Sequence, residues 1–138
     1  MIATRSRKLF VNLPVRDLRR SVAFFKELGF RFEPHFGDDT SACMVLSDEG
    51  YAMLLAEPRF QGVARKPLAD ARASTSALFA LTADSREEVD TLVQTALASG
   101  GARAADPVDH GFMYGSSFYD PDGHHWEIFY VDPSAIPP

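Results

Sequence analysis

The strongest constraint on the fold is a pattern that occurs twice along the chain. In each half, an alternating apolar segment is followed by a helical pattern that ends at glycine, and then by three further strand-like segments. The first copy covers about residues 8–57 and the second about 76–132. Internal repetition of this length indicates two similar modules. A four-stranded sheet with one helix leaves its other face bare, so we expect two such sheets to enclose a cavity.

Periodicity predicts the order strand, helix and three strands in each module. The expected strands cover residues 9–15, 30–34, 40–46 and 52–56 in the first module, and 77–81, 103–108, 113–119 and 125–131 in the second. Asp17 is the expected cap of the first helix, and Asp84 or Ser85 that of the second. The helices superpose with Val22 on Val89, and the later turns with Gly50 on Gly123. The polar stretch 58–75 lacks a sustained periodicity and is expected to connect the modules. The prediction is one α+β domain over residues 1–138, with tandem βαβββ modules that each form a mixed sheet.

Composition narrows the class of protein and of partner. The 138 residues carry a net charge of −5 and show no long basic stripe, so nucleic acid is not an expected partner. No apolar run is long enough to span a bilayer, and no signal-peptide pattern is present, so we expect a cytoplasmic protein. Cys43 is the single cysteine and lies in an apolar segment, which favours a core position over a reactive thiol.

The most informative single residue is Glu127, an acid within an aromatic strand. The preceding Asp120–Gly123 segment has turn chemistry, because proline fixes its own φ and glycine accepts positive φ. Alternation then places His125, Glu127 and Phe129 on one face. We interpret Glu127 as a carboxylate that faces an enclosed site and suits general-base chemistry. The alternative is a hydrogen-bonded carboxylate with no role in ligand binding.

Several other polar residues are candidates at lower specificity. Asn12 is polar within an apolar strand, which indicates pocket lining or a structural partner. His110 lies in a loop, and a loop on a rigid scaffold often carries function. His124 directly follows the turn and is expected to be exposed or to cap the turn, while Trp126 is expected in the core.

Two motifs, D-L-R-R-S-V-A-F-F at residues 17–25 and D-P-D-G-H-H-W-E at 120–127, resemble the vicinal oxygen chelate superfamily. This superfamily includes glyoxalase I, fosfomycin and bleomycin resistance proteins and extradiol dioxygenases. Residues 10–21, 85–90 and 110–115 also look like bacterial predicted lactoylglutathione lyases. The resemblance covers nearly the whole chain, and it implies a homodimer with a small-molecule cavity.

The resemblance also implies positions for metal ligands. They fall on Phe10, Ser76, Leu54 and Glu127, of which Glu127 alone is a competent ligand. A catalytic metal needs roughly three protein ligands. We therefore expect no cofactor, and a divalent zinc, nickel, manganese or iron ion only if His125 and Asn12 substitute for the missing ligands.

Two function classes follow from the resemblance, together with a third in which a dimer keeps a vestigial cavity. The first is a small-molecule-binding lyase or isomerase with Glu127 as base. The second is a non-enzymatic protein that sequesters a drug or metabolite. On the family pattern, Tyr114, Ser116 and Phe118 line the cavity beside Glu127, whereas Met113, Ser117 and Tyr119 face a helix or solvent. The full set of expected ligand contacts is Phe10, Asn12, Ser76, His110, Tyr114, Ser116, Phe118, His125 and Phe129.

Overall fold

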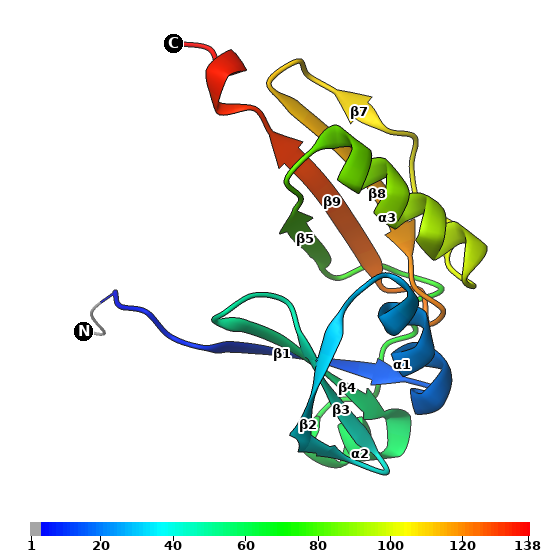
Figure 1. Ribbon diagram of the computed structural model, residues 1–138. Coiled ribbons are helices and arrows are strands. Elements are labelled where there is room, and N and C mark those ends of the chain that lie inside the picture. The colour runs from blue at the N-terminus through cyan, green and yellow to red at the C-terminus, as the bar shows by residue number, and fades with distance from the viewer. Residues whose placement is uncertain (1–3) are drawn as a thin grey trace. The chain divides into compact units, whose positions relative to one another are not determined.

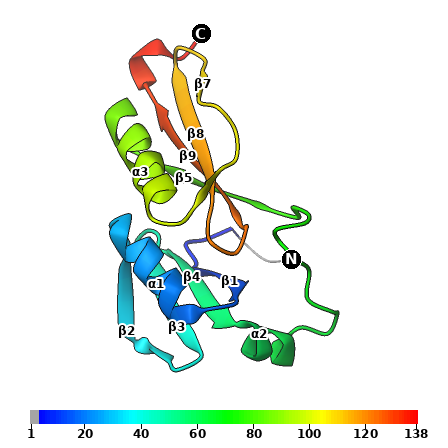
Figure 2. The same cartoon turned by 90° about the vertical axis from the view of Figure 1, so that its right-hand side faces the viewer.

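The computed structural model describes residues 4–138 and confirms a mixed α+β architecture (Figures 1 and 2). The chain divides into two compact units, residues 1–68 and 69–138, and the boundary lies within the predicted connection. Each unit contains a mixed sheet with a helix packed on it. Within residues 4–138, no helix has the length and apolarity needed to cross a membrane.

The first unit builds a four-stranded sheet in the order β1-β4-β3-β2. The strands are β1 (Leu9–Val15), β2 (Arg31–Asp38), β3 (Ser41–Val45) and β4 (Gly50–Ala56). β1 and β4 are parallel, while the other neighbours are antiparallel. A parallel pair needs a crossover, and helix α1 (Leu18–Glu27) lies within the segment that provides it. This order follows the predicted repeat closely, although β2 and β4 are longer than expected.

Helix α1 begins at the predicted cap, because the Asp17 carboxylate accepts a hydrogen bond from the Arg20 amide at 3.1 Å. Its buried face carries Ser21, Phe24 and Phe25. The core of this unit also includes Val15, Met44, Ala52 and Leu54, all nearly inaccessible to solvent. Cys43 is buried, as predicted.

The predicted connection is wrong in one respect, because it contains helix α2 (Glu57–Val63). Pro58 lies in the first turn, where its missing N–H costs no helical hydrogen bond. The helix buries none of its residues, so it lacks the apolar stripe from which periodicity identifies a helix.

The second unit has a five-stranded sheet in the order β5-β9-β8-β6, with β7 also paired to β8. Its strands are β5 (Leu78–Thr82), β6 (Ala102–Arg103), β7 (Val108–Asp109), β8 (Met113–Tyr119) and β9 (His125–Val131). β5 and β9 are parallel, and helix α3 (Arg86–Ala98) follows β5. A 3-10 turn at Pro133–Ala135 follows β9. The single strand predicted over 103–108 is broken into β6 and β7. Pro107 lies in the gap and cannot donate a hydrogen bond to the sheet.

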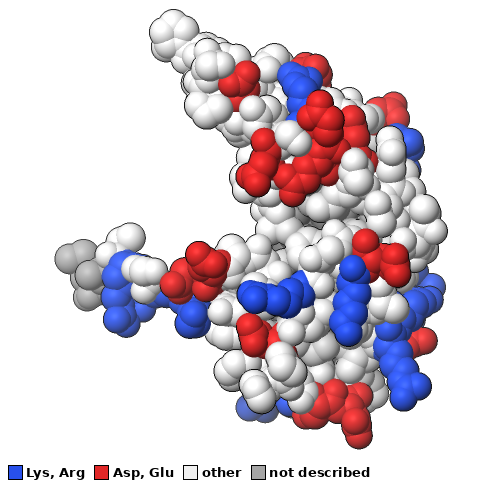
Figure 3. Space-filling view, viewed as in Figure 1, with Lys and Arg blue, Asp and Glu red and all other residues white. Residues whose placement is uncertain are grey.

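Ser85, and not Asp84, is the cap of α3, and its hydroxyl accepts from the Glu88 amide at 3.0 Å. Glu87 and Glu88 occupy the first turn, where negative charge stabilises the helix dipole. Figure 3 shows acidic side chains gathered over the start of this helix. The helix contributes Val89, Val93 and Ala96 to the core, against the sheet residues Phe118, Trp126 and Ile128.

The caps correct the alignment of the two modules. Asp17 and Ser85 are 68 residues apart (85 − 17), and the same spacing superposes buried Ser21 on buried Val89. The predicted superposition of Val22 on Val89 is therefore wrong by one residue, because Val22 lies outside the buried face of α1. The same one-residue change in repeat spacing applies to the strands of the two modules. In a strand, it makes a residue of one module correspond to a residue on the opposite face in the other module.

Candidate functional site

The open face of the second sheet carries Glu127. Along β9, Trp126 and Ile128 are buried, whereas His125, Glu127 and Phe129 are only partly buried on the other face. The alternation predicted from the sequence is thus confirmed. The Glu127 side chain keeps 36% of its surface exposed, so the described residues of this unit do not enclose it fully.

Glu127 and His125 form a close pair. His125 Nε2 lies 2.6 Å from Glu127 Oε1, and the imidazole is the more buried partner, with 15% of its side chain exposed. Residues two apart on a strand share a face, which brings the two groups within reach of each other. The ring of Tyr119 packs edge-on against the imidazole at a centroid distance of 5.3 Å. A protonated Nε2 donates to the carboxylate, so the pair can hold and pass a proton.

Beside this pair lies a cavity of about 320 Å³. Its walls come from β7, β8, β9, the segment before β7 and the loop between β7 and β8. Apolar side chains supply much of the lining, and Glu127, Asp106 and His110 supply its ionisable groups. The lining residues are Ala105, Asp106, Val108, His110, Met113, Gly115, Ser116, Ser117, Glu127 and Phe129. This volume lies at the lower end of the range for small-molecule pockets.

The predicted face of β8 is wrong. The antiparallel register places Ser117 opposite Glu127 and Tyr119 opposite His125. Tyr114 and Phe118 therefore lie on the helix side, where Phe118 is inaccessible to solvent. Ser116 shares their strand face and is buried, although it contributes to the cavity lining. The turn at Asp120–Gly123 lies between Tyr119 and His125, which pair with each other. Counting two residues outward from this pair identifies Ser117 as the residue opposite Glu127, so the turn is the sequence signal for this register.

The turn before β9 is a buried hydrogen-bonded structure. Asp120 accepts from the amides of Asp122 and His124 and from the Trp126 indole, each at 3.0 Å. Trp126 is in the core, as predicted. His124 is also buried, so the expectation of an exposed residue is wrong, whereas its expected part in the turn is confirmed by the amide that donates to Asp120. Asp120 thus fixes the start of the strand that carries Glu127.

A network from α3 fastens the loop that carries His110. Arg86 donates to both carboxylate oxygens of Asp109, at 2.7 and 3.1 Å, and to the Gly111 carbonyl at 3.1 Å. Its guanidinium also lies over the Tyr114 ring, whose hydroxyl donates to Asp90 at 2.6 Å. The hydrogen bond from Arg86, followed by that from the Gly111 amide, lowers the pKa of Asp109 to about 2. His110 itself is exposed at the cavity, as is usual for a loop residue.

The remaining predicted site residues lie elsewhere on the chain. Phe10 and Asn12 belong to the first unit, and both are exposed on one face of β1. Phe10 stacks on Tyr51 with ring centroids 4.7 Å apart, and the Asn12 amide donates to the Phe10 carbonyl at 3.2 Å. Asn12 therefore has a local structural partner. Ser76 is exposed in the segment before β5 and does not line the cavity.

The corrected alignment also changes the positions that correspond between modules. The 68-residue spacing places Leu78, rather than Ser76, at the counterpart of Phe10. Strand pairing places Ala56 opposite Val15, whereas Tyr130 follows the partner of Thr82, so β4 and β9 align at 74 residues (130 − 56). Met53, rather than Leu54, is then the counterpart of Glu127. The four corresponding positions are therefore occupied by Phe10, Met53, Leu78 and Glu127. Three of these side chains are poor ligands for a divalent metal, so the set does not fit a metal site with three or four protein ligands. Residues 4–138 contain no cluster of three His, Cys, Asp or Glu suited to a metal ion.

Each unit has a mixed sheet with one helix, and the second sheet carries a carboxylate on its open face. Comparison with known proteins shows which family has this architecture. The profile of the Glyoxalase/Bleomycin resistance protein/Dioxygenase superfamily matches residues 9–128. The chain belongs to this superfamily. None of the curated proteins matches the chain significantly.

Solved structures agree with this assignment. The chain is similar to the hypothetical protein SA1046 from S. aureus, with 29% identity, 95% of each chain covered and a TM-score of 0.78. It shares its fold with a glyoxalase/bleomycin resistance protein/dioxygenase family enzyme from Burkholderia phytofirmans PsJN, at 20% identity, coverage of 88% and 96%, and a TM-score of 0.71. A fosfomycin resistance protein, FosX, from Listeria monocytogenes matches at 19% identity, 98% coverage of each chain and a TM-score of 0.65.

Proposed function

We propose that this protein binds a small organic molecule on the open face of the second sheet and removes a proton from it, as a lyase or isomerase does. The observation that carries the proposal is the 2.6 Å contact between His125 and Glu127 beside a cavity of suitable size. Glu127 is the proton acceptor. Its second oxygen has no side-chain partner among the described residues, and it is therefore available to a substrate.

The surrounding residues support this assignment of roles. His125 orients Glu127 and stabilises its charge through one N–H, as the partner of a general base does. Val108, Met113 and Phe129 supply apolar surface for the body of the ligand. His110 lies at the cavity on a loop that Arg86 fastens, where it can donate a hydrogen bond to a substrate oxygen. The proposed ligand is therefore partly apolar and carries an acidic proton next to a polar group.

The test compares Glu127→Gln with Glu87→Gln, which changes an exposed carboxylate in the first turn of α3. Each protein is incubated in deuterium oxide with the methylglyoxal–glutathione hemithioacetal and with other α-oxoaldehyde adducts. Loss of the proton next to the carbonyl is followed by NMR. We expect Glu127→Gln to slow exchange by roughly 10²-fold or more and Glu87→Gln to leave it unchanged. Equal rates for wild type and Glu127→Gln would refute the role of Glu127.

Metal dependence is measured on the same samples, by elemental analysis of untagged protein and by add-back of zinc, nickel, manganese and iron(II). We expect exchange without stoichiometric metal. Near-stoichiometric metal that is lost in Glu127→Gln would instead mean that substitute ligands complete a metal site.

A second candidate is a homodimer that sequesters a drug or metabolite without turnover. It is favoured by the apolar residues Phe10, Met53 and Leu78 at the positions of family ligands, because sequestration requires no metal. Tight binding of cationic aromatic compounds, with chemical-shift changes at Met113 and Phe129 but no proton exchange in any adduct, would favour this candidate over the enzyme.

A further inference from the structure

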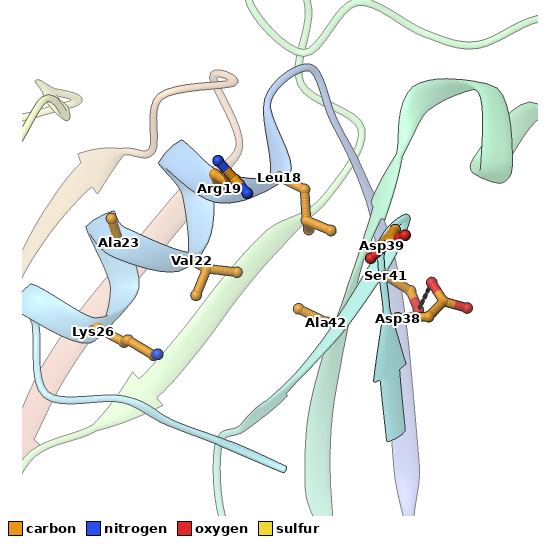
Figure 4. A pocket seen from close by; sticks show the side chains of 9 residues that line it. All are labelled: Leu18, Arg19, Val22, Ala23, Lys26, Asp38, Asp39, Ser41 and Ala42. Carbon is orange, nitrogen blue, oxygen red and sulfur yellow. Dashed lines mark hydrogen bonds between the residues drawn. The ribbon is translucent and has the colours of Figure 1, made fainter. Parts of the chain in front are cut away.

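A second cavity lies in the first unit, on the side of the sheet that packs against α1. Its volume is about 720 Å³, within the range of small-molecule pockets. Figure 4 shows that the helix forms one wall and the β2–β3 hairpin the other. The lining residues are Leu18, Arg19, Val22, Ala23, Lys26, Asp38, Asp39, Ser41 and Ala42. None of them belongs to the site described above.

The cavity exists because α1 covers only part of its sheet. The helix packs mainly on β4 and β3. The pairing of β2 with β3 is irregular between Glu33 and Asp38, a stretch that includes Pro34, which has no N–H for the ladder. An irregularity of this kind bends the strand. The helix and the hairpin therefore separate, and partly exposed apolar atoms of Val22 and Ala42 remain between them.

The helix wall supplies positive charge. Leu18, Val22 and Lys26 follow one another at four-residue spacing, so they share one side of the helix. Figure 4 shows these three side chains directed toward the strand wall. Lys26 is exposed and forms no ion pair within residues 4–138, in contrast to Arg16, which pairs with Glu57 at 3.4 Å. The Lys26 ammonium group is therefore available to an external anion.

The strand wall supplies negative charge. Asp38 is already engaged, because it accepts from Thr40, Ser41 and Arg59 at 2.8 to 3.3 Å. These hydrogen bonds, that of the Thr40 amide first, hold the pKa of Asp38 well below its usual range. Asp39 is exposed and has no side-chain partner in the described part of the chain. Asp39 therefore remains as the carboxylate that can accept a cation from outside.

We propose that this groove binds a zwitterionic molecule with an apolar middle, such as a short peptide with free termini. Its carboxylate pairs with Lys26, its ammonium group pairs with Asp39, and its apolar part covers Leu18, Val22 and Ala42. Lys26 and Asp39 lie on facing walls and determine the charges at the two ends of the ligand. The apolar side chains between these walls favour an apolar group in the middle of the ligand. This site is independent of the function proposed for Glu127.

The experiment titrates the whole ¹⁵N-labelled protein with the tripeptide Ala-Leu-Ala in four forms: free, N-acetylated, C-amidated and capped at both ends. Binding is followed by the amide shifts of Val22, Ala23 and Ala42. The compound 6-aminohexanoate carries the same two charges without peptide groups, so it distinguishes recognition of a peptide from recognition of any zwitterion. The variants are Lys26→Gln and Asp39→Asn. The matched control is Arg20→Gln, a charge removal on the same helix outside the cavity lining.

We expect the free peptide to shift these three amides and each single cap to weaken binding by about three- to fivefold, the usual size for exposed ion pairs. Lys26→Gln should weaken the free peptide but not the C-amidated one, and Asp39→Asn the free peptide but not the N-acetylated one. Because both forms meet the same variant, a general loss of helix stability cancels from this comparison. Shifts at other amides only, equal affinity for the free and doubly capped peptides, or an effect of Arg20→Gln as large as that of Lys26→Gln would overturn the proposal.

Discussion

Two features of Gly123, in the turn before β9, disfavour a side chain at this position: its backbone conformation and its close neighbours. Alanine substitutions at Gly123 and at Gly100 separate the energetic costs of the two features. Its φ of +92° is unfavourable for a residue with a side chain. A Cβ at this position would also lie 2.8 Å from the Ala71 carbonyl oxygen and 2.8 Å from the Arg72 nitrogen. Gly100, after α3, shares the first constraint but not the second, with a φ of +112° and no atom within 4 Å of its Cβ position.

The two alanine substitutions should therefore differ in cost. Gly100→Ala should lower the free energy of unfolding by about 1–2 kcal/mol, the backbone term alone. Gly123→Ala adds an overpacking term of about 1–3 kcal/mol, because the atoms that it meets belong to the backbone and not to flexible side-chain ends. We expect a total of about 2–5 kcal/mol at Gly123.

Urea unfolding followed by tryptophan fluorescence measures both variants on the relevant unit. Trp126 is the single tryptophan of the chain and is buried in the second unit, which also contains both glycines. The slope of unfolding should stay constant, so that the midpoint reports stability directly. Equal losses for the two variants would refute the reasoning, since they would mean that the turn is not pressed against residues 71–72.

Two further predictions concern the supports of the proposed active site. Asp120→Asn should lower the free energy of unfolding by about 2 kcal/mol in the same assay, because the amide that replaces one carboxylate oxygen is a donor facing other donors; an unchanged midpoint would contradict the buried network around Asp120. The pKa of Asp109 is lowered from 3.8 to about 2, first by its hydrogen bond from Arg86, so its contribution to stability is present above pH 3.8 and is lost as the pH falls toward 2. Asp109→Asn should therefore remove part of the acid-induced loss of stability between pH 4 and pH 2, and unfolding curves identical in shape to those of wild type across this interval would contradict the contribution of the pair.

The sequence by itself determined the modular architecture. The sequence predicts the bounds of β1, β8 and β9 to the residue, because each strand is flanked by a clear turn or cap signal. The placement of Glu127 and His125 on one face also followed from alternation alone. These features are local, and local periodicity is what a sequence records most directly.

Only the tertiary structure decided which residues of neighbouring strands pair and therefore share a face of the sheet. Ser117, rather than Ser116, lies opposite Glu127, and this depends on the register between two strands, which residue type alone does not specify. Leu78 and Met53 replaced Ser76 and Leu54 as module counterparts once the helix caps fixed the repeat spacing. The loop of His110 is held by Arg86, 25 residues before Gly111 in the chain. The groove beside α1 lies where the pairing of β2 with β3 is irregular, between Glu33 and Asp38. Contacts between residues distant in sequence leave no periodic pattern, so only the folded chain reveals them.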